Sequence, residues 1–130
     1  MKLTIKFIDP GTHRENITGA DWTFDKTKPL DQQHIVIKVT KMSDQKKAFA
    51  LAFHEAIEAV LCYFDGVTQE QVDEFDFNFS KTHENDIEAG DDPSSPYERQ
   101  HSVATAIERT LTAYWNIKWK EYDDEVAKLQ

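Results

Sequence analysis

Residues 43–66, SDQKKAFALAFHEAIEAVLCYFDG, decide the fold because they predict one long amphipathic helix in the middle of the chain. Ser43 is suited to cap its N-terminus, and Asp44 in the first turn complements the helix dipole. Gly66 is suited to end it, so the helix is expected over residues 43–64. Apolar residues at helical spacing predict one buried stripe, formed by Phe49, Phe53, Ile57, Val60, Leu61 and Phe64.

Within this helix, residues 54–58 form an HExxE pattern. Residues four apart lie on one helix face, so His54 and Glu58 could bind one cation together. In HExxH metallohydrolases two histidines at this spacing bind zinc, and the intervening glutamate is the general base. Glu58 stands where the second histidine would be, and Glu55 could reach a water on the ion. At about 100° per residue, His54 and Glu58 lie at the rim of the predicted stripe, with Glu55 further toward solvent.

Three strands are predicted before this helix. Residues 1–8 alternate apolar and polar side chains, residues 9–12 (DPGT) form a turn signal, and further strands are expected at 20–24 and 34–40. Short connections without a crossover helix favour a small, mainly antiparallel or mixed sheet with one covered face. Together with the helices, this predicts an α+β fold. At 130 residues the chain is expected to form a single domain, residues 1–130.

The remaining chain is predicted to be helical around one long loop. Thr68 and Gln71 form a capping box for a helix from residue 68 to about 77–79, with Val67 and Val72 as its hydrophobic staple. Residues 80–94 are polar and acidic, which predicts a long loop. A second capping box at residues 95–98 opens a helix to about 114–115, and a last helix is expected over about 118–128.

The second capping box places His101 in the second turn of its helix, directly after the acidic loop. His54, Glu58 and His101 would supply two imidazoles and a carboxylate, a donor set of catalytic zinc sites and of non-haem iron sites. Water would take the fourth position, and Glu55 would accept its proton. Further acidic residues could support this site: Glu98 or Glu108 could orient His101 through its distal nitrogen, and Glu88, Asp91 and Asp92 could approach from the loop, where solvation or loop capping is the plainer interpretation.

A plainer interpretation is also open for the ligands. In a glutamate-rich chain an HExxE pattern arises by chance, and His54 with Glu58 could form a surface hydrogen-bonded pair. His101 could equally be a surface histidine near Glu98.

Composition narrows the function classes. The formal net charge is −9, and residues 65–98 hold eleven Asp or Glu against one Lys. Such a surface repels phosphate backbones, so direct nucleic-acid binding is not expected. The lone cysteine, Cys62, suits a reducing compartment and is expected in the core. Without an apolar run of membrane length or a signal-peptide pattern, we expect a cytoplasmic protein.

Two segments carry a resemblance to a known family. Residues 33–39 (QHIVIKV), followed after a polar turn by residues 48–61 (AFALAFHEAIEAVL), resemble the strand and active-site helix of small zincin-like metallopeptidases, especially the short zincin-like proteins of bacteriophages and prophages. Residues 88–93 (EAGDDP), with Pro96, Tyr97 and His101, resemble a later segment of such phage proteins. The resemblance covers about residues 21–109.

The resemblance implies a zincin-like minimal core in which His54 is the first metal ligand and Glu55 the general base. Glu58 takes the second ligand position, whereas His101 is assigned by reach alone. Glutamate at position 58 either shifts the site toward harder metals or marks a site that has lost its metal.

Three functions follow as hypotheses. The first is a hydrolase of peptide or amide bonds that uses Zn²⁺ or another divalent transition metal and pairs an extended peptide or protein substrate with an edge strand. The second is a non-catalytic phage or prophage accessory protein, in the host cytoplasm, whose acidic surface occupies a basic partner. The third, disfavoured by the preceding strands, is an all-helical nucleotide pyrophosphohydrolase that would use Glu55 and Glu58 for magnesium. Neither the substrate nor the oligomeric state is predicted by these patterns.

Overall fold

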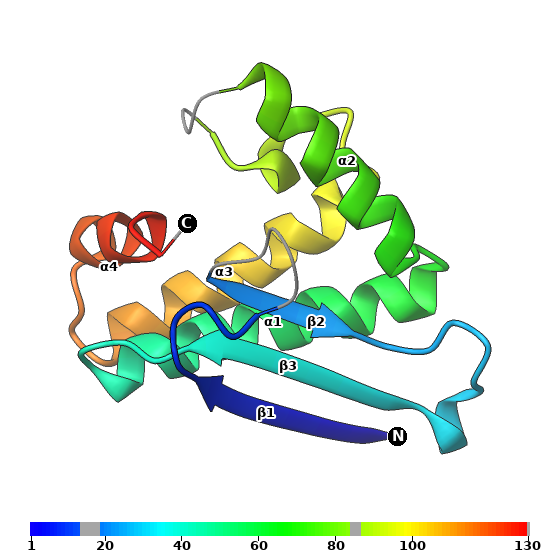
Figure 1. The fold of residues 1–130 in the computed structure, drawn as a ribbon. Helices are drawn as coiled ribbons and strands as arrows, with labels where there is room; N and C mark the ends of the chain where they lie inside the picture. The colour runs from blue at the N-terminus through cyan, green and yellow to red at the C-terminus, as the bar shows by residue number, and fades with distance from the viewer. Residues whose placement is uncertain (14–18, 84–86, 130) are drawn as a thin grey trace.

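The computed structural model describes residues 1–13, 19–83 and 87–129, which form a three-stranded sheet and four α-helices (Figure 1). The predicted α+β fold is confirmed. The elements in chain order are β1 (Lys2–Ile8), β2 (Ala20–Thr23), the short 3-10 helix η1 (Leu30–Gln32), β3 (His34–Thr40), α1 (Gln45–Asp65), α2 (Gln69–Thr82), the 3-10 helix η2 (Ala89–Asp91), α3 (Glu98–Tyr114) and α4 (Trp119–Ala127). No helix of the described ranges is both long and apolar enough to span a bilayer.

The sheet is mixed, with strand order β1-β3-β2. β3 runs parallel to β1, with Lys2 opposite His34, and antiparallel to β2, with Ala20 opposite Val39. The inward side chains of β3, Ile35, Ile37 and Val39, are fully buried. Trp22 lies opposite Ile37 on the same face, so β2 directs a buried indole toward α1.

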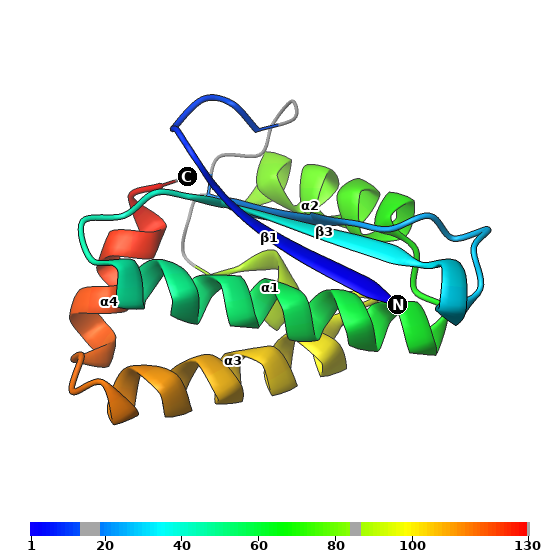
Figure 2. The same ribbon diagram turned by 90° about the horizontal axis from the view of Figure 1, so that it is seen from below.

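Helix α1 is buried on two sides, because it lies between the sheet and α3 (Figure 2). Alanines allow this close packing: Ala48, Ala50, Ala52, Ala56 and Ala59 are all buried, as is Cys62. The predicted stripe is therefore wrong at its largest members, since Phe49, Phe53 and Phe64 are 40%, 39% and 60% exposed. Phe49 instead packs edge-on against Phe7 at the margin of the sheet, with ring centroids 5.0 Å apart.

Helix boundaries follow local capping chemistry, with two corrections. Asp44, not Ser43, caps α1, since its carboxylate accepts from the Lys46 N–H at 2.9 Å. Gly66 ends α1 in the left-handed region, at φ 74°, as predicted. The capping box of α2 is also confirmed.

The predicted second capping box does not form. Helix α3 begins at Glu98, and the Ser95 hydroxyl accepts from the backbone N–H of Tyr97 at 3.3 Å. His101 therefore lies in the first turn of α3. The predicted loop 80–94 is shorter than expected, because α2 continues to Thr82 and η2 forms within it.

Candidate metal centre

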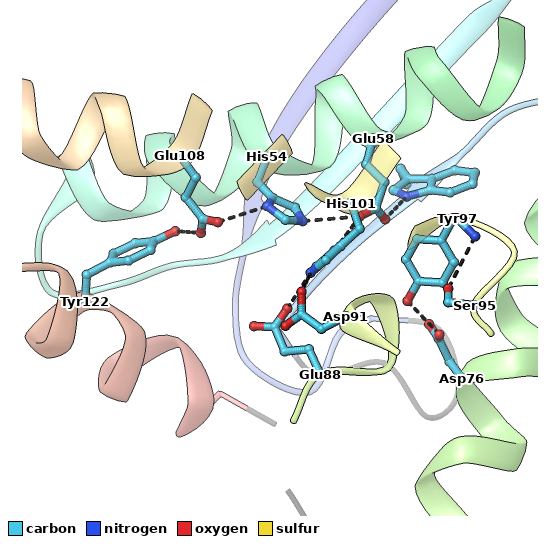
Figure 3. A network of polar contacts seen from close by, with 11 residues as sticks. His54, Glu58, Asp76, Glu88, Asp91, Ser95, Tyr97, His101, Glu108 and Tyr122 are labelled. Carbon is cyan, nitrogen blue, oxygen red and sulfur yellow. Dashed lines mark hydrogen bonds and ion pairs between the residues drawn. The ribbon is translucent and has the colours of Figure 1, made fainter. Parts of the chain in front are cut away.

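Three residues from two helices meet in the interior beside the sheet. His54 and Glu58 come from α1 and His101 from α3, and each is only 5% exposed (Figure 3). One donor atom from each lies within 4.8 Å of the other two, a spacing that could hold a metal ion. The structure thus brings together the three predicted ligands. The expected position at the rim is wrong, because the sheet and α3 bury His54 and Glu58 in the interior.

The inward-facing atoms of the cluster converge on one carboxylate oxygen. Oε2 of Glu58 lies 3.2 Å from Nε2 of His54 and 2.9 Å from Nδ1 of His101. The two imidazole rings are 4.8 Å apart between centroids and inclined at 71°. Two nitrogens and one oxygen therefore face a common point.

The outward-facing atoms of the α1 residues are held by other side chains. Nδ1 of His54 lies 2.9 Å from Oε1 of Glu108, which as an acceptor places the imidazole proton on Nδ1. The Tyr122 hydroxyl donates to the other oxygen of Glu108. The indole N–H of Trp22 donates to Oε1 of Glu58 at 2.9 Å. The contacts with Glu108 and Trp22 thus orient His54 and Glu58. Nε2 of His54 and Oε2 of Glu58 are left to face His101 and could bind a metal ion.

Electrostatics favour charged forms of the cluster in the absence of metal. Burial opposes ionisation of Glu58, but hydrogen bonds from His101 and His54 outweigh it and lower its pKa to about 2. Burial likewise opposes a charge on His101, yet contacts with Glu58 and Glu88 raise its pKa to about 10. The pKa of His54 is raised well above its usual value by Glu108 and Glu58 against the effect of burial. A metal ion must therefore displace protons from both histidines.

Glu55 faces a cavity of about 890 Å³ that also contains the cluster. It is half-buried and therefore more exposed than His54 and Glu58, as expected. Burial, followed by the negative charge of Glu58, raises its pKa well above the usual value. A carboxylate with a raised pKa is a stronger proton acceptor, as a general base requires.

The cavity is strongly acidic. None of its described lining residues is Lys or Arg, whereas eight are carboxylates: Asp21, Glu55, Glu58, Asp73, Glu74, Asp76, Glu88 and Glu108. The Tyr97 hydroxyl donates to Asp76 at 2.7 Å, and burial raises the pKa of Asp76 to about 7. The cavity therefore has the charge to attract cations.

The two predicted supporting glutamates lie in different places. Glu108 contacts His54 rather than His101, because it is on the side of α3 that faces the middle of α1. Glu98 is half-buried beside a separate hollow that also involves Asp65, and no hydrogen bond or ion pair links it to His101. Asp92 caps the backbone N–H of Ser94, in agreement with the plainer interpretation of that residue.

Sequence reasoning missed Trp22 and Tyr122 as parts of the cluster. The hydrogen bond of Trp22 to Glu58 spans 36 positions. No local pattern marks such a contact, since it depends on how β2 and α1 pack. Comparison with protein-family models, curated proteins and solved structures found no match to the chain.

Proposed function

We propose that the protein is a metal-dependent hydrolase of peptide or amide bonds. His54, Glu58 and His101 hold Zn²⁺ or another divalent transition metal, and Glu55 is the general base. The observation that carries the proposal is the orientation of the cluster: Trp22 and Glu108 hold the outer atoms of Glu58 and His54, and the inner atoms face His101.

The residues fit a metal in donor type and in surroundings. Two imidazoles and a carboxylate form the protein donor set of several catalytic zinc sites. Histidine ligands of metals commonly donate their other ring N–H to a carboxylate, as His54 does toward Glu108. Glutamate at position 58 retains one free oxygen as a ligand and makes the set more suitable for harder metals than two histidines would.

The chemistry would be proton transfer in an acidic cavity. A divalent cation with an open position lowers the pKa of a bound water toward neutrality. Glu55 lines the same cavity, and its raised pKa makes its carboxylate a stronger proton acceptor. His54 and Glu58 are kept in place by their outer contacts, so the centre is organised before substrate binds.

An edge strand suggests why the substrate would be a peptide. Ala20, Asp21 and Trp22 of β2 line the cavity. The Thr40 N–H donates to the Gly19 carbonyl, so Gly19 and Thr40 form a hydrogen-bonded pair of β2 and β3. Hydrogen-bonded and non-hydrogen-bonded pairs alternate along antiparallel strands, so the backbone N–H and C=O groups of Ala20 and Trp22 point away from β3. An extended peptide could pair with these groups and pass its backbone beside the centre.

Metal analysis and one isosteric variant test the proposal. The purified protein should bind about one zinc per chain, and His54→Ala or His101→Ala should lose it. Glu55→Gln should keep the zinc but lower turnover of a peptide library at least about a hundredfold, as expected for a general base. Glu98→Gln, on α3 outside the cluster, is the matched control and should change neither. A protein that cannot be loaded at micromolar zinc, or a Glu55→Gln variant with unchanged turnover, would contradict the proposal.

A second candidate function is binding of a basic partner without catalysis. The acidic lining of the cavity favours it, and so does the acidic stretch over residues 65–98. Fluorescence anisotropy with a labelled lysine-rich peptide tests this function. Binding should weaken steeply between 50 and 300 mM salt, on the order of tenfold or more, if charge attraction drives it. The absence of binding at low salt would eliminate this candidate.

A further inference from the structure

A second group of donors lies on the other side of the His101 ring. Nε2 of His101 is 3.0 Å from Oε2 of Glu88 and 3.3 Å from Oδ1 of Asp91. This nitrogen is buried, and neither contact has hydrogen-bond geometry, so it has no hydrogen-bond partner within the described ranges. Buried polar atoms are nearly always satisfied in folded proteins. A buried imidazole nitrogen that lies this close to two carboxylates, without hydrogen-bond geometry to either, is therefore an unusual arrangement that a cation would complete by displacing the proton of the nitrogen.

The backbone of η2 brings the two carboxylates together. The Asp91 N–H donates to the Glu88 carbonyl at 3.0 Å across this single turn. Residues three apart in a 3-10 turn lie over one another, so both side chains project to the same side despite their like charges. One donor atom from each of Glu88, Asp91 and His101 lies within 4.8 Å of the others.

Packing fixes the ring against this turn. A Cβ atom at Gly90 would lie 2.5 Å from Cγ of His101, so the absence of a side chain at Gly90 is what admits the imidazole. On its other sides the ring contacts His54 and the edge of Tyr97, with centroids 4.8 and 5.9 Å away. The position of Nε2 is therefore set by the fold and does not depend on the carboxylates.

We propose that Glu88, Asp91 and Nε2 of His101 form a second divalent-cation site, separate from the centre that involves Nδ1 of the same ring. The Glu88 and Asp91 side chains are 48% and 56% exposed, so water can complete the coordination and the ion can exchange with solvent. Two exposed carboxylates and water beside one imidazole form a mainly oxygen donor set, which suits Mn²⁺ better than Zn²⁺. This site goes beyond the hydrolase function and does not depend on it.

Mn²⁺ is the probe, because its sharp electron paramagnetic resonance signal in solution is lost on binding. We call the first centre, formed by His54, Glu58 and Nδ1 of His101, the inner centre. The variant His54→Gln/Glu58→Gln removes two of its ligands and should still bind one Mn²⁺ per chain at the second site. Adding Glu88→Gln and Asp91→Asn to it should weaken that binding at least about tenfold. As a matched control for charge, Glu121→Gln and Asp124→Asn on α4 are added instead, and Mn²⁺ binding should not change.

Two results would overturn the second site. The first is no Mn²⁺ binding by His54→Gln/Glu58→Gln, which would mean that Glu88 and Asp91 only form ion pairs with the ring. The second is equal binding after Glu88→Gln and Asp91→Asn. Should the starting variant fail to fold, as judged by circular dichroism, the isosteric Glu58→Gln replaces it with the same outcomes. This experiment measures Mn²⁺ binding and not peptide turnover, so its outcome is independent of whether the hydrolase proposal fails.

Discussion

Trp22 offers a sharp test of the inner centre, because its indole N–H holds one oxygen of Glu58 from behind. Trp22→Phe keeps an aromatic ring in the core but removes this donor, which lies 2.9 Å from Oε1 in a buried setting. A hydrogen bond to a charged group contributes about 1.5–3 kcal/mol. At 1.4 kcal/mol per factor of ten, loss of this orientation should lower zinc affinity about ten- to a hundredfold, the range typical for residues that position metal ligands.

Zinc affinity should be measured by competition with a chromophoric chelator, and stability by urea unfolding in the same buffer. Trp115→Phe, at the C-terminal end of α3, is the matched control and should leave zinc affinity within about twofold of wild type. If Trp22→Phe destabilises the fold yet keeps wild-type zinc affinity, Glu58 is not a ligand and the proposed centre is refuted. The comparison separates the two effects because any general loss of packing appears in the urea curve.

Three further predictions concern the protons and packing around the cluster. Because the pKa of His101 is raised to about 10, zinc must displace a proton from this ring, and zinc affinity should rise at least about tenfold per pH unit between pH 6 and 7; the raised pKa of His54 acts in the same direction. Chelator competition at both pH values measures this dependence, and equal affinities would contradict the prediction. Gly90→Ala should push the His101 ring aside, which should lower the free energy of unfolding in urea by about 1–3 kcal/mol and also lower zinc affinity. A variant as stable as wild type would mean that the ring has room to move. The pKa of Asp76 is about 7 in the folded protein, above its ordinary value of 3.8, so the folded protein holds this proton more tightly and loses stability as pH rises from about 4 to 7. Asp76→Asn removes this effect and should be about 2–4 kcal/mol more stable than wild type at pH 8 but not at pH 4. Urea unfolding with chelator present measures both values.

Much of the fold could be predicted because it follows from local signals. Strand alternation marked β1 and β3, and Gly66 ended α1 where the left-handed conformation is needed. The capping box at Thr68 likewise acts over three residues. The pairing of His54 with Glu58 follows from helical spacing alone, and His101 followed from its place near a helix start after an acidic loop. Each of these inferences needs only a few neighbouring residues.

The face that α1 buries could not be predicted in this way. Phenylalanines dominate an apolar pattern, whereas alanine contributes little to it, so Phe49, Phe53 and Phe64 outweighed the alanines on the neighbouring face. The structure favours the alanine face because only small side chains let α1 approach both the sheet and α3. That choice is made by tertiary packing, and it moves His54 and Glu58 from the rim into the interior.

The same packing explains why glutamate fits position 58 better than the histidine of the HExxH pattern. Glu58 accepts from Trp22 at one oxygen, while its other oxygen faces both His54 and His101. A neutral imidazole accepts at only one nitrogen and donates at the other, so a histidine here would leave the Trp22 N–H unpaired or give up the shared point with the other rings. An unpaired buried donor costs about 1–3 kcal/mol. The surrounding donors therefore require glutamate at position 58, because the Trp22 N–H needs an acceptor in addition to the oxygen that faces His54 and His101.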